Sequence, residues 1–194
     1  MSNKVKAAII GLGWAGCEHL KGYVENPQSE VIAVCDMDED RARQIAKENN
    51  IPHVFTDHQK MLEQSEIDVV SIGLPNFLHA PVTIDALNAG KHVLSEVIAA
   101  TTLDECYALV ETVEQTGMTY MMAENYCYRR EAMMIKNMTD SHAFGDLTYA
   151  EGAYIHDCRD LMFDSTLART WRGGSWGKSG DQKTLEAINL ETGE

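Results

Sequence analysis

A glycine-rich turn at residues 11–16 carries the most specific chemical pattern in this chain. It reads Gly11-Leu12-Gly13-Trp14-Ala15-Gly16 and follows an apolar run, Val5–Ile10. In a turn from strand to helix, Gly11 permits the tight bend, Gly13 lets backbone N–H groups approach a pyrophosphate, and Gly16 allows close packing. The pyrophosphate would lie at the N-terminus of the following helix. The pattern predicts a dinucleotide site; the alternative is a glycine turn without a ligand.

An acidic residue supports this interpretation. Asp36 closes the next apolar run, twenty residues past Gly16. A carboxylate there accepts hydrogen bonds from the adenosine ribose hydroxyls and repels a 2′-phosphate, which predicts NAD in preference to NADP. No arginine immediately follows Asp36, although Arg41 and Arg43 lie on the next predicted helix.

The composition excludes several other classes of protein. The 194 residues include 16 basic and 30 acidic side chains, a formal net charge of −14, without a basic cluster that could follow phosphates or an anionic membrane. No apolar stretch approaches the ~20 residues of a membrane span. Five cysteines without a CxxC spacing predict reduced, mostly buried thiols and no metal site. We expect a cytoplasmic protein with neither nucleic-acid nor membrane partners.

The elements that must position the turn alternate between strand and helix, the pattern of a parallel sheet covered on both faces. Strands are predicted at 5–10, 31–35, 53–55, 67–73, 92–95 and 119–123. Helices are predicted after Gly16, from the cap Asp38 to Asn49, at 78–88, and from the cap Thr102 to Thr116, where Gly117 ends the last one. The fold class is α/β, a Rossmann-type doubly wound parallel sheet over residues 1–123.

The pattern changes after residue 123. Residues 129–138 are predicted to be helical and 147–156 to form a long strand, so 124–172 would be part of an α+β second domain. Six methionines around this change are expected to fill a core and not to form a ligand site: Met118, Met121, Met122, Met133, Met134 and Met138. Residues 173–194, rich in glycine and polar side chains, predict a loose tail.

Several segments together point to a family. They are the glycine turn, Cys35-Asp36, Leu74-Pro75-Asn76 with His79, and Gly90-Lys91-His92-Val93-Leu94-Ser95-Glu96. In this combination the chain resembles the Gfo/Idh/MocA group of sugar-acting, nicotinamide-dependent oxidoreductases. In that family the last segment usually continues as Glu-Lys-Pro, and the lysine serves catalysis. Here Glu96 is followed by Val97, which can neither accept nor donate a proton.

Two later segments make the resemblance more specific. They are Met122-Ala123-Glu124-Asn125-Tyr126-Cys127-Tyr128-Arg129-Arg130 and Ala150-Glu151-Gly152-Ala153-Tyr154-Ile155-His156-Asp157. With Glu-Val in place of Glu-Lys, they resemble the branch of NAD-dependent α-N-acetylgalactosaminidases. The resemblance implies that NAD⁺ oxidises the sugar at carbon 3, elimination expels the aglycone, water adds and the hydride returns. Such a cycle needs general acid/base groups near the sugar.

Three residues are candidates for this proton transfer. The resemblance makes Glu124, at the end of the last predicted strand, an active-site residue; a capping carboxylate is the alternative. Tyr154 and His156 lie two apart on a predicted strand and would face the same side, where both can move protons. A half-buried tyrosine and a surface histidine are the alternative reading.

The resemblance also extends the cofactor site to the nicotinamide end. Glu96, Asn76 and Asn125 occupy positions of nicotinamide contact in the family, and each could instead be a polar residue at a strand end. His79 could merely pack at a helix start. The full predicted cofactor site consists of Gly11, Gly13, Trp14, Ala15, Gly16, Asp36, Pro75, Asn76, His79, Glu96 and Asn125.

The length leaves the activity open. Family members continue for well over a hundred further residues, and Thr170-Trp171-Arg172 is not followed here by the branch's Tyr-Pro-Thr-His segment. We expect a second domain that is incomplete, with unpaired strand edges that favour a homo-oligomer. Three hypotheses remain: a sugar-directed glycosidase, a sugar or inositol dehydrogenase in which His156 replaces the absent lysine, and an NAD-binding domain without turnover.

Overall fold

The computed structural model describes residues 4–64, 66–153, 155, 157–163 and 165–170, and the chain divides into two compact units. The first unit is Met1–Ala123 and the second is Glu124–Glu194. Among the described residues, no helix combines the length and the apolar character that crossing a bilayer requires.

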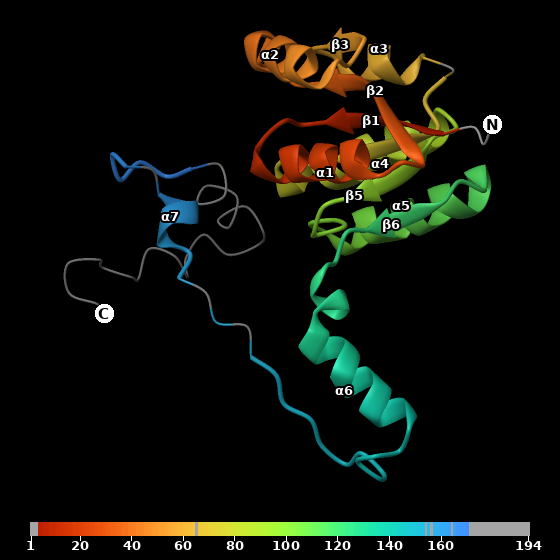
Figure 1. The fold of residues 1–194 in the computed structure, drawn as a ribbon, viewed down its shortest axis with the longest axis vertical. Helices are drawn as coiled ribbons and strands as arrows, with labels where there is room; N and C mark the ends of the chain where they lie inside the picture. Colours follow the sequence, from red (N-terminus) through yellow and green to blue (C-terminus); the bar gives the residue numbers. More distant parts are fainter. Residues whose placement is uncertain (1–3, 65, 154, 156, 164, 171–194) are drawn as a thin grey trace. The chain divides into compact units, whose positions relative to one another are not determined.

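The first unit is built on one six-stranded sheet in which every strand pairing is parallel (Figure 1). Its strands are β1 (Val5–Ile10), β2 (Ser29–Cys35), β3 (His53–Phe55), β4 (Val69–Ile72), β5 (His92–Ser95) and β6 (Tyr120–Met122). The order β3-β2-β1-β4-β5-β6 confirms the predicted doubly wound Rossmann-type fold. The strand order reverses between β1 and β4, and open α/β sheets bind ligands at the carboxyl ends of strands at such a point.

The helices begin and end close to the predicted positions. They are α1 (Trp14–Glu25), α2 (Glu39–Asn49), α3 (His58–Leu62), α4 (His79–Asn88) and α5 (Leu103–Thr116), with a 3₁₀ turn η1 (Asn76–Leu78) before α4. Asp38 caps α2, Thr102 and Glu105 form a reciprocal capping box on α5, and Gly117 ends α5 with φ of 67°. The five-residue helix α3 was not predicted, because it is too short to show a helical period.

Two apolar layers cover the two faces of the sheet, since successive side chains of a strand point to opposite sides. On β1, Ala8 and Ile10 pack with residues of α3 and α4, such as Met61 and Leu87. Ile9, between them, packs on the other face with α1 and α2 through residues such as Leu20 and Ala46. The carboxyl end of β1 is therefore held by apolar residues on both faces, and β4 and β5 pack into the first of the two layers.

The second unit contains η2 (Tyr126–Tyr128), α6 (Arg130–Asp140), α7 (Arg159–Met162) and an isolated bridge between Phe163 and Arg169. The predicted strand over 147–156 is wrong for its described residues, 147–153 and 155, which lie in no strand. An alternating pattern supplies a face for packing, but a strand also needs a neighbour for its backbone groups. The expected core role is also wrong for four of the methionines, which are exposed: Met121 and Met122 on β6, and Met133 and Met134 on α6.

Candidate functional site

The glycine turn combines two positions that the fold fills completely with one that it leaves open. Gly11 has φ of +85°, and a Cβ there would lie 2.5 Å from the carbonyl oxygen of Gly73. A Cβ on Gly16 would lie 1.8 Å from the carbonyl oxygen of Gly11. Gly13 is different, because its Cβ would meet nothing within 4 Å. The close packing of the turn explains the outer glycines, while Gly13 leaves room for a ligand.

The open position lies at a helix N-terminus without a protein cap. Gly13 is the N-cap of α1, no side chain in the described part of the chain caps the first turn, and that turn has no acidic residue. Trp14 is 84% exposed and Ala15 is half-buried. Free N–H groups and the positive end of the helix dipole suit an anion, so these residues fit the pyrophosphate of a dinucleotide.

Asp36 stands at the end of β2 and is tied to the same turn. Its Oδ2 accepts a hydrogen bond from the Leu12 N–H at 2.7 Å, and its Oδ1 accepts one from the Asp38 N–H at 2.9 Å. Each carboxylate oxygen can still accept a second hydrogen bond, as binding of a ribose hydroxyl would need. Arg41 lies with its guanidinium 3.8 Å from Asp36 Oδ2. The sequence placed Arg41 on α2 but did not show that its guanidinium lies near the Asp36 carboxylate. The capping turn at Asp38 brings the two side chains together.

The segments after β4 and β5 are joined by a buried histidine. Pro75 and Asn76 are half-buried at the start of η1. His79 is 1% exposed, and its Nδ1 and Nε2 each lie 2.7 Å from a backbone carbonyl oxygen, of Ile98 and Leu74 respectively. A neutral ring has one N–H, so only the imidazolium donates to both carbonyls. Both ring nitrogens of His79 are thus engaged within the protein, and a direct cofactor contact by His79 stays a prediction.

Glu96 follows β5 directly and belongs to a hydrogen-bonded group that sequence reasoning missed. Its Oε1 lies 2.9 Å from Nε2 of His19 on α1, and Nδ1 of His19 lies 2.6 Å from Oγ of Ser71 on β4. Hydrogen bonding from His19 is the main cause that lowers the pKa of Glu96. The available signal for this group was the position of His19, which lies one turn after Gly16 on a helix that packs on the sheet.

The predicted proton-transfer residues belong to the second unit. Glu124 Oε1 accepts a hydrogen bond from the Tyr126 N–H at 2.9 Å, at the start of the turn η2. Asn125 is exposed. Tyr154 and His156 lie outside the described residues. The catalytic roles of Glu124, Tyr154 and His156 and the cofactor role of Asn125 remain predictions.

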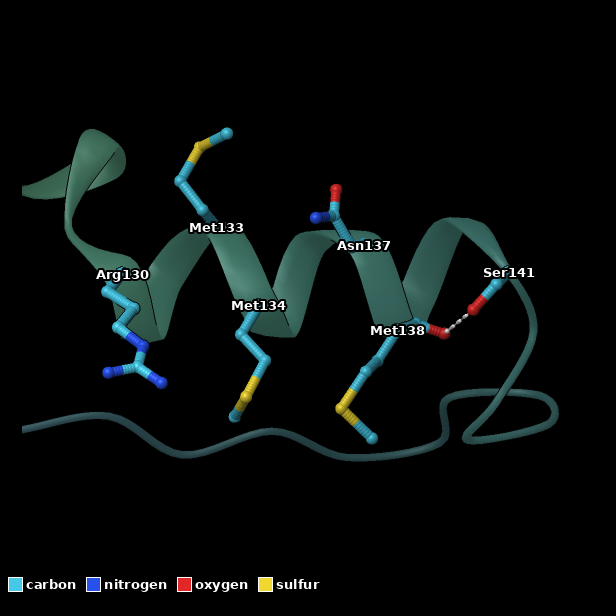
Figure 2. Close-up of a pocket in the computed structure, with 6 residues that line it drawn as sticks. All are labelled: Arg130, Met133, Met134, Asn137, Met138 and Ser141. Atoms are coloured by element: carbon cyan, nitrogen blue, oxygen red, sulfur yellow. Dashed lines mark hydrogen bonds between the residues drawn. The ribbon is translucent and has the colours of Figure 1, made fainter.

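A cavity of about 450 Å³ lies along α6. Figure 2 shows Arg130, Met134 and Met138 pointing from one side of this helix, as their four-residue spacing requires. The remaining lining residues are Met133, Asn137 and Ser141. This lining contains no carboxylate, histidine or cysteine that could transfer a proton or bind a metal. Over the described part of the chain, no group of three or more His, Cys, Asp or Glu side chains is placed to hold a metal.

The cysteines offer no activated thiolate near the turn. Burial raises the pKa of Cys35 to about 12 and also raises that of Cys17, whose Sγ donates to the Leu12 carbonyl. The expectation of mostly buried thiols is wrong, because Cys106, Cys127 and Cys158 are exposed. Their exposure reflects their places on a helix surface and in the second unit.

Comparison with known families matches both units. Residues 5–124 match the Gfo/Idh/MocA oxidoreductase family with an NAD-binding Rossmann fold. Residues 128–187 match the C-terminal domain of glycosyl hydrolase 109.

Similar proteins include a glycosyl hydrolase family 109 protein 2 and an alpha-N-acetylgalactosaminidase, both of Bacteroides fragilis. They are 38% and 37% identical to this chain over 185 residues, which is 90% of this chain and 43% of each relative. The chain thus spans less than half the length of these curated relatives. Among solved structures, scyllo-inositol dehydrogenase from Lactobacillus casei with bound NAD(H) and scyllo-inositol has a TM-score of 0.72 at 24% identity. That match covers 75% of this chain and 44% of the dehydrogenase, and it shows a shared fold.

Proposed function

Because the chain belongs to the Gfo/Idh/MocA oxidoreductase family with an NAD-binding Rossmann domain, we propose that it acts on a sugar and cleaves α-N-acetylgalactosaminides with a recycled NAD. The observation that carries the proposal is the open, uncapped helix N-terminus at Gly13 beside the Asp36 carboxylate. The similarity to an alpha-N-acetylgalactosaminidase favours this substrate class. Val97, in the place of the family's lysine, favours a route other than simple dehydrogenation.

The first unit would hold the cofactor through three groups. The N–H groups at the start of α1 bind the pyrophosphate, Asp36 accepts hydrogen bonds from the adenosine ribose, and Glu96 faces the nicotinamide end. When bound, NAD supplies reversible hydride acceptance at the sugar. The protein's own part is to orient the sugar against that cofactor and to exclude competing ligands.

The second unit would supply proton transfer to and from the sugar. Tyr154, His156 and Glu124 are the groups with suitable chemistry, since histidine titrates near neutrality and the tyrosine hydroxyl can relay a proton. We propose a matching functional division, in which residues 1–123 bind the dinucleotide and residues 124–172 belong to the substrate domain.

A single assay distinguishes this proposal from the two alternatives. An aryl α-N-acetylgalactosaminide is incubated with the protein and NAD⁺, and the released aryl alcohol and the NADH absorbance are followed together. Recycled NAD predicts release of the alcohol without accumulation of NADH. Steady NADH formation with a free sugar or inositol would indicate a dehydrogenase instead. Calorimetric binding of NAD with neither reaction would remove the enzyme proposal for this chain.

A matched pair of tyrosine variants tests the catalytic assignment. Tyr154→Phe should abolish turnover while NAD affinity stays as in wild type, because only the proton-carrying hydroxyl is lost. Tyr149→Phe is the control, since Tyr149 lies on the same run of sequence, is exposed, and its hydroxyl donates to Glu151 Oε2 at 2.9 Å. Equal turnover in both variants would rule out Tyr154 as a proton carrier.

A further inference from the structure

A buried chain of hydrogen bonds runs beneath α1 from the sheet to its carboxyl edge. Ser71 Oγ lies 2.6 Å from Nδ1 of His19, and Nε2 of His19 lies 2.9 Å from Glu96 Oε1. His19 and Glu96 are 77 residues apart in sequence. The exposed fraction of the side chain is 12% for His19 and 26% for Glu96, so the chain opens to solvent mainly at Glu96.

One assignment of hydrogens satisfies every member of this chain. An ionised Glu96 only accepts, so His19 must donate through Nε2–H. The Nδ1 atom of a neutral His19 ring then accepts, and the Ser71 hydroxyl donates to it. Ser71 therefore selects the ring tautomer that presents its N–H to Glu96.

The same three groups do not form a hydrolytic triad, although Ser71, His19 and Glu96 follow the order of nucleophile, base and acid. Ser71 is 0% exposed on β4, so its hydroxyl cannot meet a substrate. A ligand can therefore meet this hydrogen-bonded group only at Glu96, its exposed end.

The surroundings of Glu96 favour its anionic form. The pKa of this carboxyl is lowered first by the hydrogen bond from His19 and also by the hydrogen bond from the Val97 N–H, while burial opposes them. The Val97 N–H donates to Oε2 at 3.2 Å, which leaves each carboxylate oxygen with one protein donor.

We propose that His19 is a positioning residue that holds the Glu96 carboxylate ionised and in one orientation at the carboxyl edge of the sheet, with Ser71 setting the tautomer of the His19 ring. The inference rests on the cofactor part of the proposed function, because the site that Glu96 faces is the nicotinamide end. A fixed, acceptor-only carboxylate selects ligand groups that donate, such as hydroxyls and amides.

A carboxyl titration in the NAD-free full-length chain tests the proposal directly. Glutamate side chains are labelled with ¹³C, and the resonance missing in Glu96→Gln identifies Glu96. In wild type this resonance should titrate below the ordinary glutamate value. In His19→Leu its midpoint should rise by about one pH unit, the scale on which a nearby charge or hydrogen bond shifts a carboxyl pKa. His19→Gln retains a donor and should restore most of the difference.

The His58–Asp85 pair provides a matched control. Its Nε2–Oδ2 distance is also 2.9 Å, but it links α3 and α4, away from the Glu96 turn. His58→Leu should leave the Glu96 titration unchanged. An unaltered Glu96 midpoint in folded His19→Leu, or no recovery in His19→Gln, would overturn the proposal.

A second variant keeps the test decisive where His19→Leu fails to fold. Ser71→Ala leaves the ring in place and removes only the donor to Nδ1, so ¹⁵N imidazole shifts should report loss of the single Nε2–H tautomer. Retention of that tautomer in Ser71→Ala would contradict the proposed role of Ser71.

Calorimetry with NAD then links the group to the cofactor. Affinity should fall in His19→Leu and return toward wild type in His19→Gln, while unaltered affinity in His19→Leu would contradict a positioning role at the cofactor. A failure of the proposed function has a different signature. In that case no variant, wild type included, binds NAD or cleaves the glycoside, while the carboxyl and imidazole titrations still behave as expected.

Discussion

Asp36 accepts a hydrogen bond from the Leu12 backbone at 2.7 Å, so the carboxylate expected to meet the ribose is attached to the glycine turn expected to meet the pyrophosphate. The two parts of the candidate cofactor site are therefore one rigid arrangement. A change at Asp36 should affect both the ribose contact and the shape of the turn.

The first prediction concerns Asp36→Ala. NAD affinity should fall at least about tenfold, because a hydrogen bond to a charged group contributes about 1.5–3 kcal/mol. The ratio of NADP to NAD affinity should rise, since the repelling carboxylate is gone and Arg41 remains 3.8 Å from its former position. Calorimetry with both cofactors measures the two effects. Asp40→Ala, an exposed carboxylate in the first turn of α2, is the control, and equal affinities in the two variants would count against the ribose contact.

Gly13→Ala distinguishes an effect on NAD binding from an effect on the stability of the fold. Its φ of −70° suits alanine, and the added methyl meets no protein atom within 4 Å. The unfolding temperature should therefore stay close to wild type while NAD affinity drops, because the methyl occupies the space in which a pyrophosphate would approach the backbone. Thermal unfolding and calorimetry on the same sample check this. Unchanged NAD affinity would remove the turn from the cofactor site.

Gly16→Ala should instead damage the fold itself. The new Cβ would stand 1.8 Å from the Gly11 carbonyl oxygen and 2.9 Å from its carbon, and because both are backbone atoms they leave little room for relaxation. We expect a loss of several kcal/mol in unfolding free energy or failure to fold, beyond the 1–3 kcal/mol typical of overpacking. Gly22→Ala on the same helix is the control. It meets nothing within 4 Å and should stabilise the protein by about 0.5–1 kcal/mol in urea unfolding. Similar stability of the two variants would contradict the close packing.

His79→Ala tests the link between the segments after β4 and β5. It leaves the Leu74 and Ile98 carbonyls without their buried ring donors, and each unsatisfied group costs about 1–3 kcal/mol. Unfolding free energy should fall by at least about 2 kcal/mol, on the scale of those penalties. His53→Ala, at an exposed position of β3, is expected to change it little. If NAD affinity falls by more than the smaller fraction of folded protein accounts for, the result would instead support a direct cofactor contact by His79.

Much of the first unit follows from local sequence. Buried strands such as Val69–Ile72 are short apolar runs, and Asp38, Thr102 and Gly117 mark helix ends through their own backbone and side-chain preferences. The order of these elements leads to a doubly wound sheet because parallel strands need crossovers. The same local reasoning failed over 147–156, where an alternating pattern alone could not supply a partner strand.

The sequence by itself thus determined the Rossmann-type sheet, the glycine turn and the carboxylate at Asp36, because each depends on neighbours close in the chain. Only the tertiary structure decided which groups Glu96 and His79 contact. His19, Ser71 and Glu96 lie on three separate elements, and their contact exists because β1, β4 and β5 bring distant segments to one edge. Hydrogen bonds act over about 3 Å, so such a group forms only when the packed core fixes those elements against one another.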